Sequence, residues 1–263
     1  MATRTFTGGA ASGVLTNTSN WDTYPTAGDD ALINATSYNL TGDISAVNLG
    51  SLTVTKGWKG AKFGTEATPV TIQVNGAGRY ANLDFGPTCR VANIAAGTAV
   101  TLARITSTGG ATVVLSGSTA FTEVQGGPGG FIYADAPITT LHTCKSRITC
   151  GTNGTAITTA FVDENGLLDT ERNVTTVYND GKFINRNATT VGTLHNSGYW
   201  NPRSTGTVTT YYARSGSVLD PTGGIGQFTI TTINDFVGAI VNLSGDGYSI
   251  AFGTYNPIGK TSR

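Results

Sequence analysis

Four aromatic residues stand as two adjacent pairs, and they are the clearest sign of surface chemistry in this sequence. Tyr199-Trp200 and Tyr211-Tyr212 lie in neighbouring sequence repeats. On a regular strand, adjacent side chains point to opposite faces, so one ring of each pair is expected to point outward. Exposed rings suit a subunit interface, where Tyr and Trp are enriched, or the flat face of a sugar. We favour the interface and keep a glycan-binding strip as the alternative.

The acidic residues offer a weaker case for glycan cleavage. A glycan hydrolase needs two carboxyl groups presented together, as acid and nucleophile or as acid and base. Asp163 and Glu164 are adjacent, but neighbouring strand residues point to opposite faces. Asp169 and Asp220 are interpreted as structural residues of turns. We therefore predict that the chain is not an enzyme, although carboxylates from different repeats could still converge.

Metal and cofactor chemistry has little support in the remaining side chains. His142 and His195 each follow a Thr-Thr pair closely and could share one wall, but two imidazoles alone do not make a metal site. Cys89, Cys144 and Cys150 match neither a zinc spacing nor a disulfide framework and are interpreted as buried thiols. We predict neither a metal nor a cofactor.

The elements that must position these residues repeat along the second half of the chain. An apolar or small residue is followed by two threonines six times, at spacings of 14 to 22 residues. Each repeat is too small to bury an apolar face alone and must stack on its copies, which predicts a solenoid. The pairs are Thr139-Thr140, Thr158-Thr159, Thr175-Thr176, Thr189-Thr190, Thr209-Thr210 and Thr231-Thr232.

A second pattern follows most of these pairs, namely a glycine, a short apolar run and then Asp or Asn. Glycine is expected to open a corner because a tight turn often needs a positive φ, and Asp or Asn to close the next. Stacked in register, these residues should form ladders along the axis. A β-sandwich also has short strands and frequent turns, but the longer paired period favours coils. The units begin at Gly166, Gly181, Gly198, Gly216 and Gly238.

Composition and the regularity of the motifs divide the chain into three segments. Residues 1–30 are assigned to an N-terminal cap with Trp21 as its plug, because an end coil would otherwise expose its core and its unpaired edge. Residues 31–250 form the β-helix domain and residues 251–263 an extended C-terminal tail. No segment shows a helical period. Strands predicted before residue 138 include Ser45–Asn48, Val70–Val74, Tyr80–Phe85, Arg90–Ile94, Ala99–Ile105 and Phe131–Ala134.

The charge balance narrows the class of partner. Basic and acidic residues number 16 each, and charged residues make up 12% of the 263. No field is therefore expected to gather nucleic acid or an anionic membrane. No stretch approaches the roughly 18 apolar residues of a membrane span, and the amino terminus lacks the features of a secretion signal. We expect a protein made in the cytoplasm, whose partners are held by shape and neutral contacts.

Motifs near the amino terminus are similar to those of a known class of proteins. Asn20-Trp21, Pro25 and Gly28-Asp29-Asp30 lead into an apolar strand, and Leu40-Thr41-Gly42-Asp43 and Leu52-Thr53-Val54 follow. This run resembles the opening of right-handed parallel β-helix proteins of bacterial surfaces and bacteriophage particles. The Gly-apolar-Asn/Asp units are similar to their coils, so the resemblance covers most of the chain. It implies an all-β, single right-handed parallel β-helix and, without a secretion signal, the phage group of tailspikes, head fibres and capsid decoration proteins, commonly trimers.

Within that group we expect a structural virion protein. It would be a capsid decoration (cement) protein on the capsid surface, assembled in the host cytoplasm as a homotrimer. Its partner would be the major capsid protein, and it would stabilise the head shell against the pressure of packaged DNA. The alternatives are a phage tailspike or receptor-binding fibre that recognises host glycans, a β-helix polysaccharide lyase or hydrolase, and a fragment of a bacterial adhesin.

Overall fold

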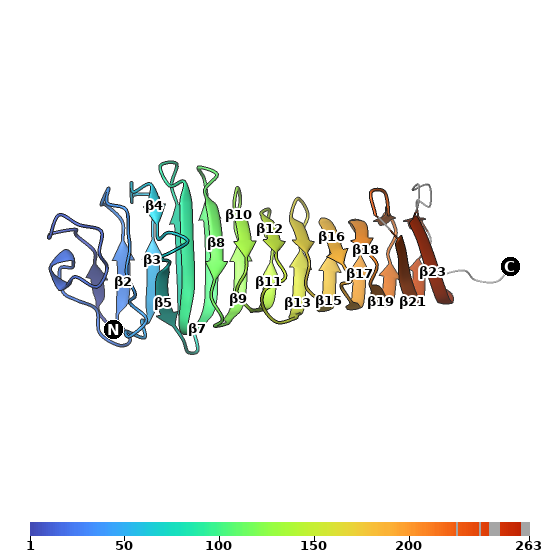
Figure 1. Ribbon diagram of the computed structural model, residues 1–263, viewed down its shortest axis with the longest axis horizontal. Helices are drawn as coiled ribbons and strands as arrows, with labels where there is room; N and C mark the ends of the chain where they lie inside the picture. The colour runs from blue at the N-terminus through green and yellow to red at the C-terminus, as the bar shows by residue number, and fades with distance from the viewer. Residues whose placement is uncertain (225, 237, 242–247, 259–263) are drawn as a thin grey trace. The chain divides into compact units, whose positions relative to one another are not determined.

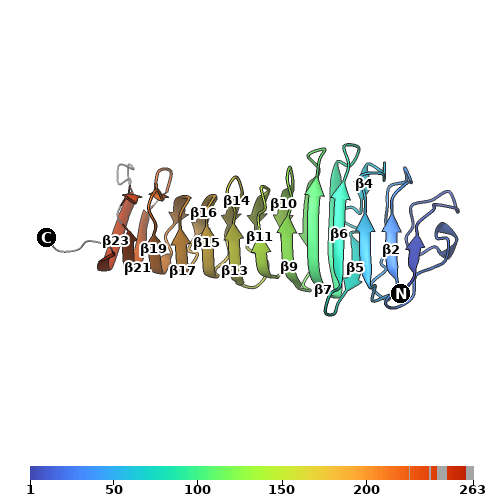
Figure 2. The same ribbon diagram turned by 180° about the vertical axis from the view of Figure 1, so that it is seen from behind.

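Short strands follow one another as parallel rungs within each of two parts of the chain (Figures 1 and 2). The structure is a computed structural model and describes residues 1–224, 226–236, 238–241 and 248–258. It has two compact units, residues 1–139 (unit 1) and residues 140–263 (unit 2). The predicted all-β fold, a parallel β-helix of right-handed type, is confirmed.

Unit 1 is built from two main runs of parallel pairing. One run joins β1, β2, β3, β6, β7 and β9, and the other joins β4, β7, β8 and β10, while β5 also pairs with β7. The elements are β1 (Thr3–Thr5), the 3₁₀ turn η1 (Thr18–Asn20), β2 (Asp30–Ile33), β3 (Ser51–Val54), β4 (Lys62–Phe63), β5 (Val70–Val74), β6 (Tyr80–Phe85), β7 (Val91–Ser107), β8 (Thr112–Ser116), β9 (Phe121–Gly126) and β10 (Phe131–Ala134).

Trp21 closes the amino-terminal end of unit 1. Its indole is almost fully buried, meets Phe6 edge to face at 5.2 Å between ring centroids, and donates from Nε1 to the Leu15 carbonyl at 2.8 Å. Phe6 and Trp21 also form an antiparallel bridge, and the Asp22 amide donates to the Thr5 carbonyl at 3.0 Å. Residues after η1 therefore lie along the edge of β1.

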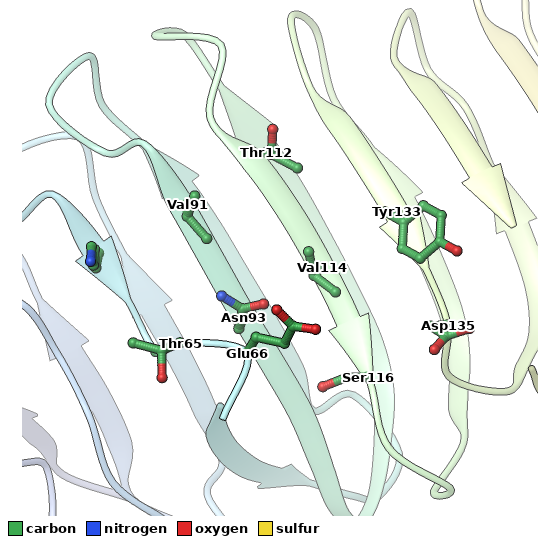
Figure 3. A pocket seen from close by; sticks show the side chains of 11 residues that line it. Thr65, Glu66, Val91, Asn93, Thr112, Val114, Ser116, Tyr133 and Asp135 are labelled. Carbon is green, nitrogen blue, oxygen red and sulfur yellow. The ribbon is translucent and has the colours of Figure 1, made fainter. Parts of the chain in front are cut away.

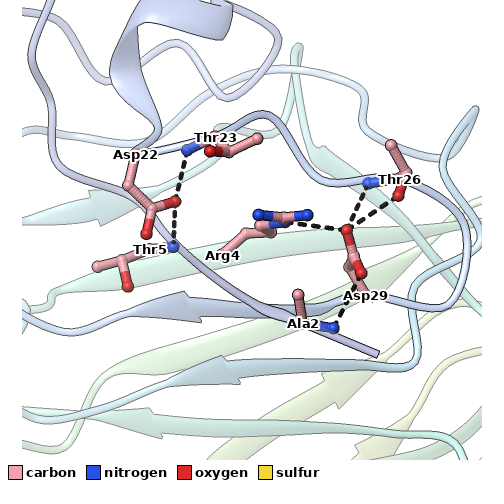
Figure 4. A network of polar contacts seen from close by, with 7 residues as sticks. All are labelled: Ala2, Arg4, Thr5, Asp22, Thr23, Thr26 and Asp29. Carbon is pink, nitrogen blue, oxygen red and sulfur yellow. Dashed lines mark hydrogen bonds and ion pairs between the residues drawn. The ribbon is translucent and has the colours of Figure 1, made fainter.

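Asp29 fastens the same end through four donors (Figure 4). Its carboxylate accepts from the Ala2 amide and from Arg4 Nε, each at 3.0 Å, and from the amide and hydroxyl of Thr26 at 3.2 and 2.9 Å. These bonds, led by that from Ala2, hold the pKa of Asp29 well below its ordinary value. One carboxylate thus connects β1, the capping segment and the start of β2.

One predicted break between strands and one predicted strand in unit 1 are wrong. Arg90–Ile94 and Ala99–Ile105 were expected as separate strands, but β7 is continuous from Val91 to Ser107 because it serves several neighbours in turn: β4 and β8 at its start, β5 in its middle, and β6 and β9 at its end. Residues 45–48 are not a strand but part of a turn, with a Val47 amide to Ile44 carbonyl bond of 3.0 Å. The predictions for β5, β6 and β10 match at both ends.

Unit 2 has two walls of parallel strands. Wall A comprises β11 (Ile138–His142), whose first two residues belong to unit 1, and β13, β15, β17, β19, β21 and β23. Wall B comprises β12, β14, β16, β18, β20 and β22. The bounds are β12 (Arg147–Cys150), β13 (Ile157–Val162), β14 (Leu167–Thr170), β15 (Val174–Asn179), β16 (Lys182–Asn187), β17 (Val191–Asn196), β18 (Tyr199–Ser204), β19 (Thr207–Ala213), β20 (Val218–Leu219), β21 (Gly226–Phe236), β22 (Ile240–Val241) and β23 (Tyr248–Ile258).

The rung register is more regular than the threonine pairs suggested. Five of the six pairs lie on strands of wall A, but Thr189-Thr190 lie in the turn before β17. The rung of β17 uses Gly192-Thr193, because Val191 lies opposite Val174 and Thr193 opposite Thr176. With this correction, the central rungs repeat every 17 residues, and Thr193 lies opposite Thr210 in turn.

Glycine is required at the first position of the second pattern for one of two physical reasons. Gly216 and Gly238 have positive φ values of 80° and 95°, as expected. Gly181 and Gly198 do not, and close packing requires glycine there instead. A Cβ at Gly181 would lie 2.2 Å from the Asp163 carbonyl oxygen, and one at Gly198 would lie 2.3 Å from the Gly181 carbonyl oxygen.

The expected ladder of corner Asp and Asn residues is wrong in register. Asp169 lies opposite Ile184 rather than Asn185, and Asn185 lies opposite Pro202. A buried amide ladder occurs elsewhere, on wall A, where Asn179 Nδ2 donates to Asn196 Oδ1 at 2.6 Å. The boundary expected after residue 250 falls inside β23, and residues 259–263 of the predicted tail lie outside the described residues.

Candidate functional site

A groove crosses the outer surface of unit 1 (Figure 3). Its volume is about 610 Å³. The floor is formed by two rows of residues that lie side by side on neighbouring strands. One row is Lys62, Val91 and Thr112, and the other is Asn93, Val114 and Tyr133. The loop between β4 and β5 forms one side, and its Glu66 side chain extends over the strands.

The groove combines an apolar floor with polar groups of several kinds. Tyr133 is 43% exposed. Val114 lies opposite it, Val91 lies farther along the groove, and both are half-buried. The carboxylates of Glu66 and Asp135 and the hydroxyl of Ser116 line the same hollow. An aromatic ring with hydroxyl and carboxylate groups around it suits a ligand that has both an apolar face and many hydroxyl groups.

Sequence reasoning placed the candidate site elsewhere and missed this groove. The available signal was Phe131–Ala134, where Phe131 and Tyr133 share one strand face while Ile132 and Ala134 share the other. Phe131 and Tyr133 are exposed, and Ile132 and Ala134 are buried. The loop carrying Glu66 had no sequence pattern that would have placed it over β7 and β8.

Two of the four predicted aromatic site residues lie in the core of unit 2. Trp200 and Tyr211 are 0% and 1% exposed and face one another across the two walls, with ring centroids 4.9 Å apart. Trp200 Nε1 donates to Asn185 Oδ1 at 2.9 Å, and the Tyr211 hydroxyl accepts from Asn196 Nδ2 at 3.1 Å. Burial raises the pKa of Tyr211 to about 12. Neither ring is available to a ligand in this structure.

The other two predicted residues point outward, as strand alternation requires, but on different walls. Tyr199 lies on wall B, donates its hydroxyl to Asp220 Oδ2, and has Lys182 Nζ 5.1 Å from its ring centroid. Tyr212 lies on wall A and stacks on His195 at 4.7 Å. The four residues therefore do not form one continuous strip.

Wall A carries instead a column of five stacked rings, which we call the ring column. Successive centroids are 4.5, 5.1, 4.9 and 4.7 Å apart, and the interplanar angles do not exceed 10°. Because each inner ring has both faces covered by its neighbours, the column offers ring edges, not faces, to a partner. The ring column consists of His142, Phe161, Tyr178, His195 and Tyr212.

A threonine column runs beside the ring column, two residues earlier on each strand. One threonine per rung lies opposite the next without interruption, which makes a row of methyl and hydroxyl groups spaced by the distance between neighbouring strands, about 4.8 Å. The members are Thr140, Thr159, Thr176, Thr193, Thr210, Thr232 and Thr254.

The candidate metal-binding and catalytic residues of unit 2 are separated from one another or have structural roles. His142 and His195 are both in the ring column but are separated there by Phe161 and Tyr178. Asp169 is buried and accepts from Arg186 Nε and Nη2 at 2.6 and 2.7 Å. In the residues that the structure describes, no group of three or more His, Cys, Asp or Glu side chains could hold a metal ion.

The cysteines are not joined by disulfide bonds. Cys89 and Cys150 are buried, which raises the pKa of their thiols to about 11 and about 12, whereas Cys144 is partly exposed. The prediction of buried thiols therefore holds for two of the three. The described residues include no helix with the length and hydropathy needed to cross a lipid bilayer.

Comparison with known proteins adds no relative to this geometry. No family model matches the chain, and neither the curated proteins nor the solved structures contain a match.

Proposed function

We propose that this protein is a non-enzymatic structural component of a bacteriophage virion, a capsid decoration (cement) protein. In this role a homotrimer binds the major capsid protein on the capsid surface and stabilises the head shell, after assembly in the host cytoplasm. The parallel β-helix is compatible with this role and with tailspike and lyase roles. The observation that carries the proposal is the regular outer face of wall A.

The outer face of wall A is preorganised for binding. Each ring of the ring column is held by the ring above or below it, and the threonine column continues over seven rungs. Six intervals of about 4.8 Å make a row about 29 Å long. Side chains that are already ordered lose little conformational entropy on binding, which favours association with another rigid surface.

The even balance of charge supports contact by shape. With 16 basic and 16 acidic residues, no long-range field draws the protein to a charged surface. Association through wall A should therefore depend weakly on salt, in contrast to binding governed by exposed charges. Retention of the protein on particles washed in about 1 M salt, where the Debye length is about 3 Å, is the expected result.

The test is cryo-electron microscopy of the particle with and without this protein. The proposal expects density at three-fold or quasi-three-fold positions of the capsid lattice, and loss of that density in particles lacking the protein. Rebinding with Thr193→Arg, which places a charge in the middle of the threonine column, should fail. Glu164→Gln, at an exposed turn, is the matched control. Density confined to the tail would contradict the proposal.

The groove of unit 1 favours a second candidate, a tailspike or receptor-binding fibre that holds host glycans. Aromatic rings beside hydroxyl and carboxylate groups suit a sugar, and Tyr133 presents such a ring. Retention of host surface polysaccharide by the purified protein, lost in Tyr133→Ala and kept in Phe131→Ala, would support this reading. Turnover lost in Glu66→Gln or Asp135→Asn would support a hydrolase or lyase. Trp200 variants would report folding, because that ring is buried.

A further inference from the structure

The last rung that the structure describes, β23, has the residue pattern of an inner rung. In β23, Phe252, Thr254, Tyr255 and Asn256 lie opposite Ile230, Thr232, Ile233 and Asn234 of β21. The threonine column thus continues into β23. An amide pair follows the ring column, with Asn256 Nδ2 donating to Asn234 Oδ1 at 3.1 Å. A strand with this pattern would fit beneath a further strand.

The apolar interior is open at this rung. Phe252 and Tyr255 are 46% and 53% exposed, while Ile230 and Ile233, in the same columns one rung earlier, are 0% and 8% exposed. The two exposed rings border an almost wholly apolar hollow of about 300 Å³ that also touches Leu219. Exposed apolar surface that continues directly into a core is characteristic of an interaction site.

The strand edge is also unguarded. Among the described residues, β21 is the only strand that pairs with β23. Exposed edges are normally protected by charged residues, yet the sequence Tyr248–Ile258 contains none, and its single edge-blocking residue is Pro257 near the end. An incoming strand would supply partners for the backbone groups along the outer edge of β23.

The other end of the chain does not offer a complementary edge. The segment around Trp21 and Asp22 already lies against β1, and Arg4 and Asp29 place charges beside that strand. Head-to-tail stacking of copies would need this edge to be open. A contact between two β23 edges needs no second surface, because an isologous interface uses the same patch from both copies.

We propose that two copies of this chain associate end to end through β23. The two strands pair antiparallel about a two-fold axis, and Phe252 and Tyr255 of each copy cover the open interior of the other. This association goes beyond the virion role and does not depend on it, since it belongs to the purified chain. If the proposed trimer also forms, the two contacts together give a hexamer.

The first test is the mass of the purified full chain in solution, measured by sedimentation equilibrium. The expected mass is an even multiple of the chain mass, and it should halve in Phe252→Asp. Thr254→Lys places a charge on the strand without touching the interior and should have the same effect. Phe131→Asp, a 50% exposed position on β10, is the matched control and should leave the mass unchanged. A single-chain mass, or an assembly that Phe252→Asp and Thr254→Lys leave intact, would overturn the proposal.

A cross-link tests the geometry. In a Cys144→Ser background, Thr254→Cys lies near the middle of β23, where a two-fold axis brings equivalent residues together. Mild oxidation should give a covalent dimer at low protein concentration. Ala10→Cys, exposed at the capped end, should remain monomeric under the same conditions. A third variant carries both Thr254→Cys and Ala10→Cys. A disulfide in this variant between β23 of one copy and the amino-terminal end of another would show head-to-tail stacking and contradict the proposal.

Discussion

The direction of the Trp200 side chain determines whether this residue binds a partner or packs in the core. The indole lies between the two walls of unit 2, against Tyr211 and Phe228, and its one polar atom is bonded to Asn185. A ring in this position contributes to stability and to the spacing of the walls. The adjacent Tyr199 faces outward on the same strand, so neighbouring residues of like chemistry have unlike roles.

Trp200→Phe is expected to lower the free energy of unfolding by about 1 to 3 kcal/mol, because it leaves the buried Asn185 Oδ1 without its donor. Urea unfolding followed by circular dichroism measures the change. Tyr133→Phe removes a hydroxyl from an exposed ring and should change stability by less than about 0.5 kcal/mol. Equal effects of the two substitutions would contradict the structural role of the Trp200–Asn185 bond.

Asp29 is expected to make the amino-terminal end sensitive to acid. Its pKa is lowered on folding, so its contribution to stability is present above the ordinary pKa of 3.8 and is lost as the pH falls further. Hydrogen exchange of the β1 and β2 amides should therefore rise below about pH 4, relative to the intrinsic exchange rate. Asp29→Asn should show raised exchange at pH 7 and a weaker dependence on acid. An unchanged profile in this variant would assign the acid response to other groups.

At the scale of elements, wall A shows how a repeat turns local pairing into a continuous surface. A ring in the same position of every rung must stack on the next, because parallel strands in register place equivalent side chains about 4.8 Å apart. That distance lies within the roughly 4.5–7 Å between ring centroids that offset-stacked aromatic pairs prefer. The ring column is therefore a direct consequence of the register and stabilises it in return.

Phe161→Leu is expected to lower the stability of unit 2 by about 1 to 3 kcal/mol, because Phe161 stacks on both His142 and Tyr178 and each aromatic contact contributes about 0.5 to 1.5 kcal/mol. Thermal unfolding checks the loss. Thr176→Val, in the neighbouring threonine column, keeps the shape of the side chain and should change stability by no more than about 0.5 kcal/mol. A Phe161→Leu variant as stable as Thr176→Val would show that the stacked rings do not support the wall.

At the scale of the whole molecule, the solenoid principle limits how far a defect should spread. Each rung contacts mainly its neighbours, so stability is close to a sum of rung and nearest-neighbour contributions. In unit 1, Trp58, Phe63 and Phe85 form an edge-to-face cluster with centroids 5.5 to 6.2 Å apart. This cluster gives a local probe of that behaviour.

Trp58→Ala is expected to cost about 3 to 5 kcal/mol locally, since the indole is fully buried and its Nε1 donates to the Tyr38 carbonyl. Amide hydrogen exchange should rise first in β3, β4 and β6, while β15 and β17 keep their protection. Trp21→Ala, in the capping segment, should instead expose β1 and β2. A uniform rise along the entire chain after either change would indicate all-or-none unfolding.

Local sequence pattern was enough to predict the class of fold and the presence of a rung repeat. Small repeats with paired threonines, glycines and short apolar runs must stack to bury their faces, so a parallel solenoid followed from Ile138–Asn242 without further information. Strand alternation likewise predicted one outward ring in each aromatic pair. Which ring that was depended on the assembled walls, since Trp200 and Tyr211 face each other only when both walls are in place. The true rung at Thr193, the groove beneath the loop that carries Glu66, and the open end at Phe252 also came from the three-dimensional structure. These features depend on register and on contacts between residues far apart in the chain, which local pattern does not contain.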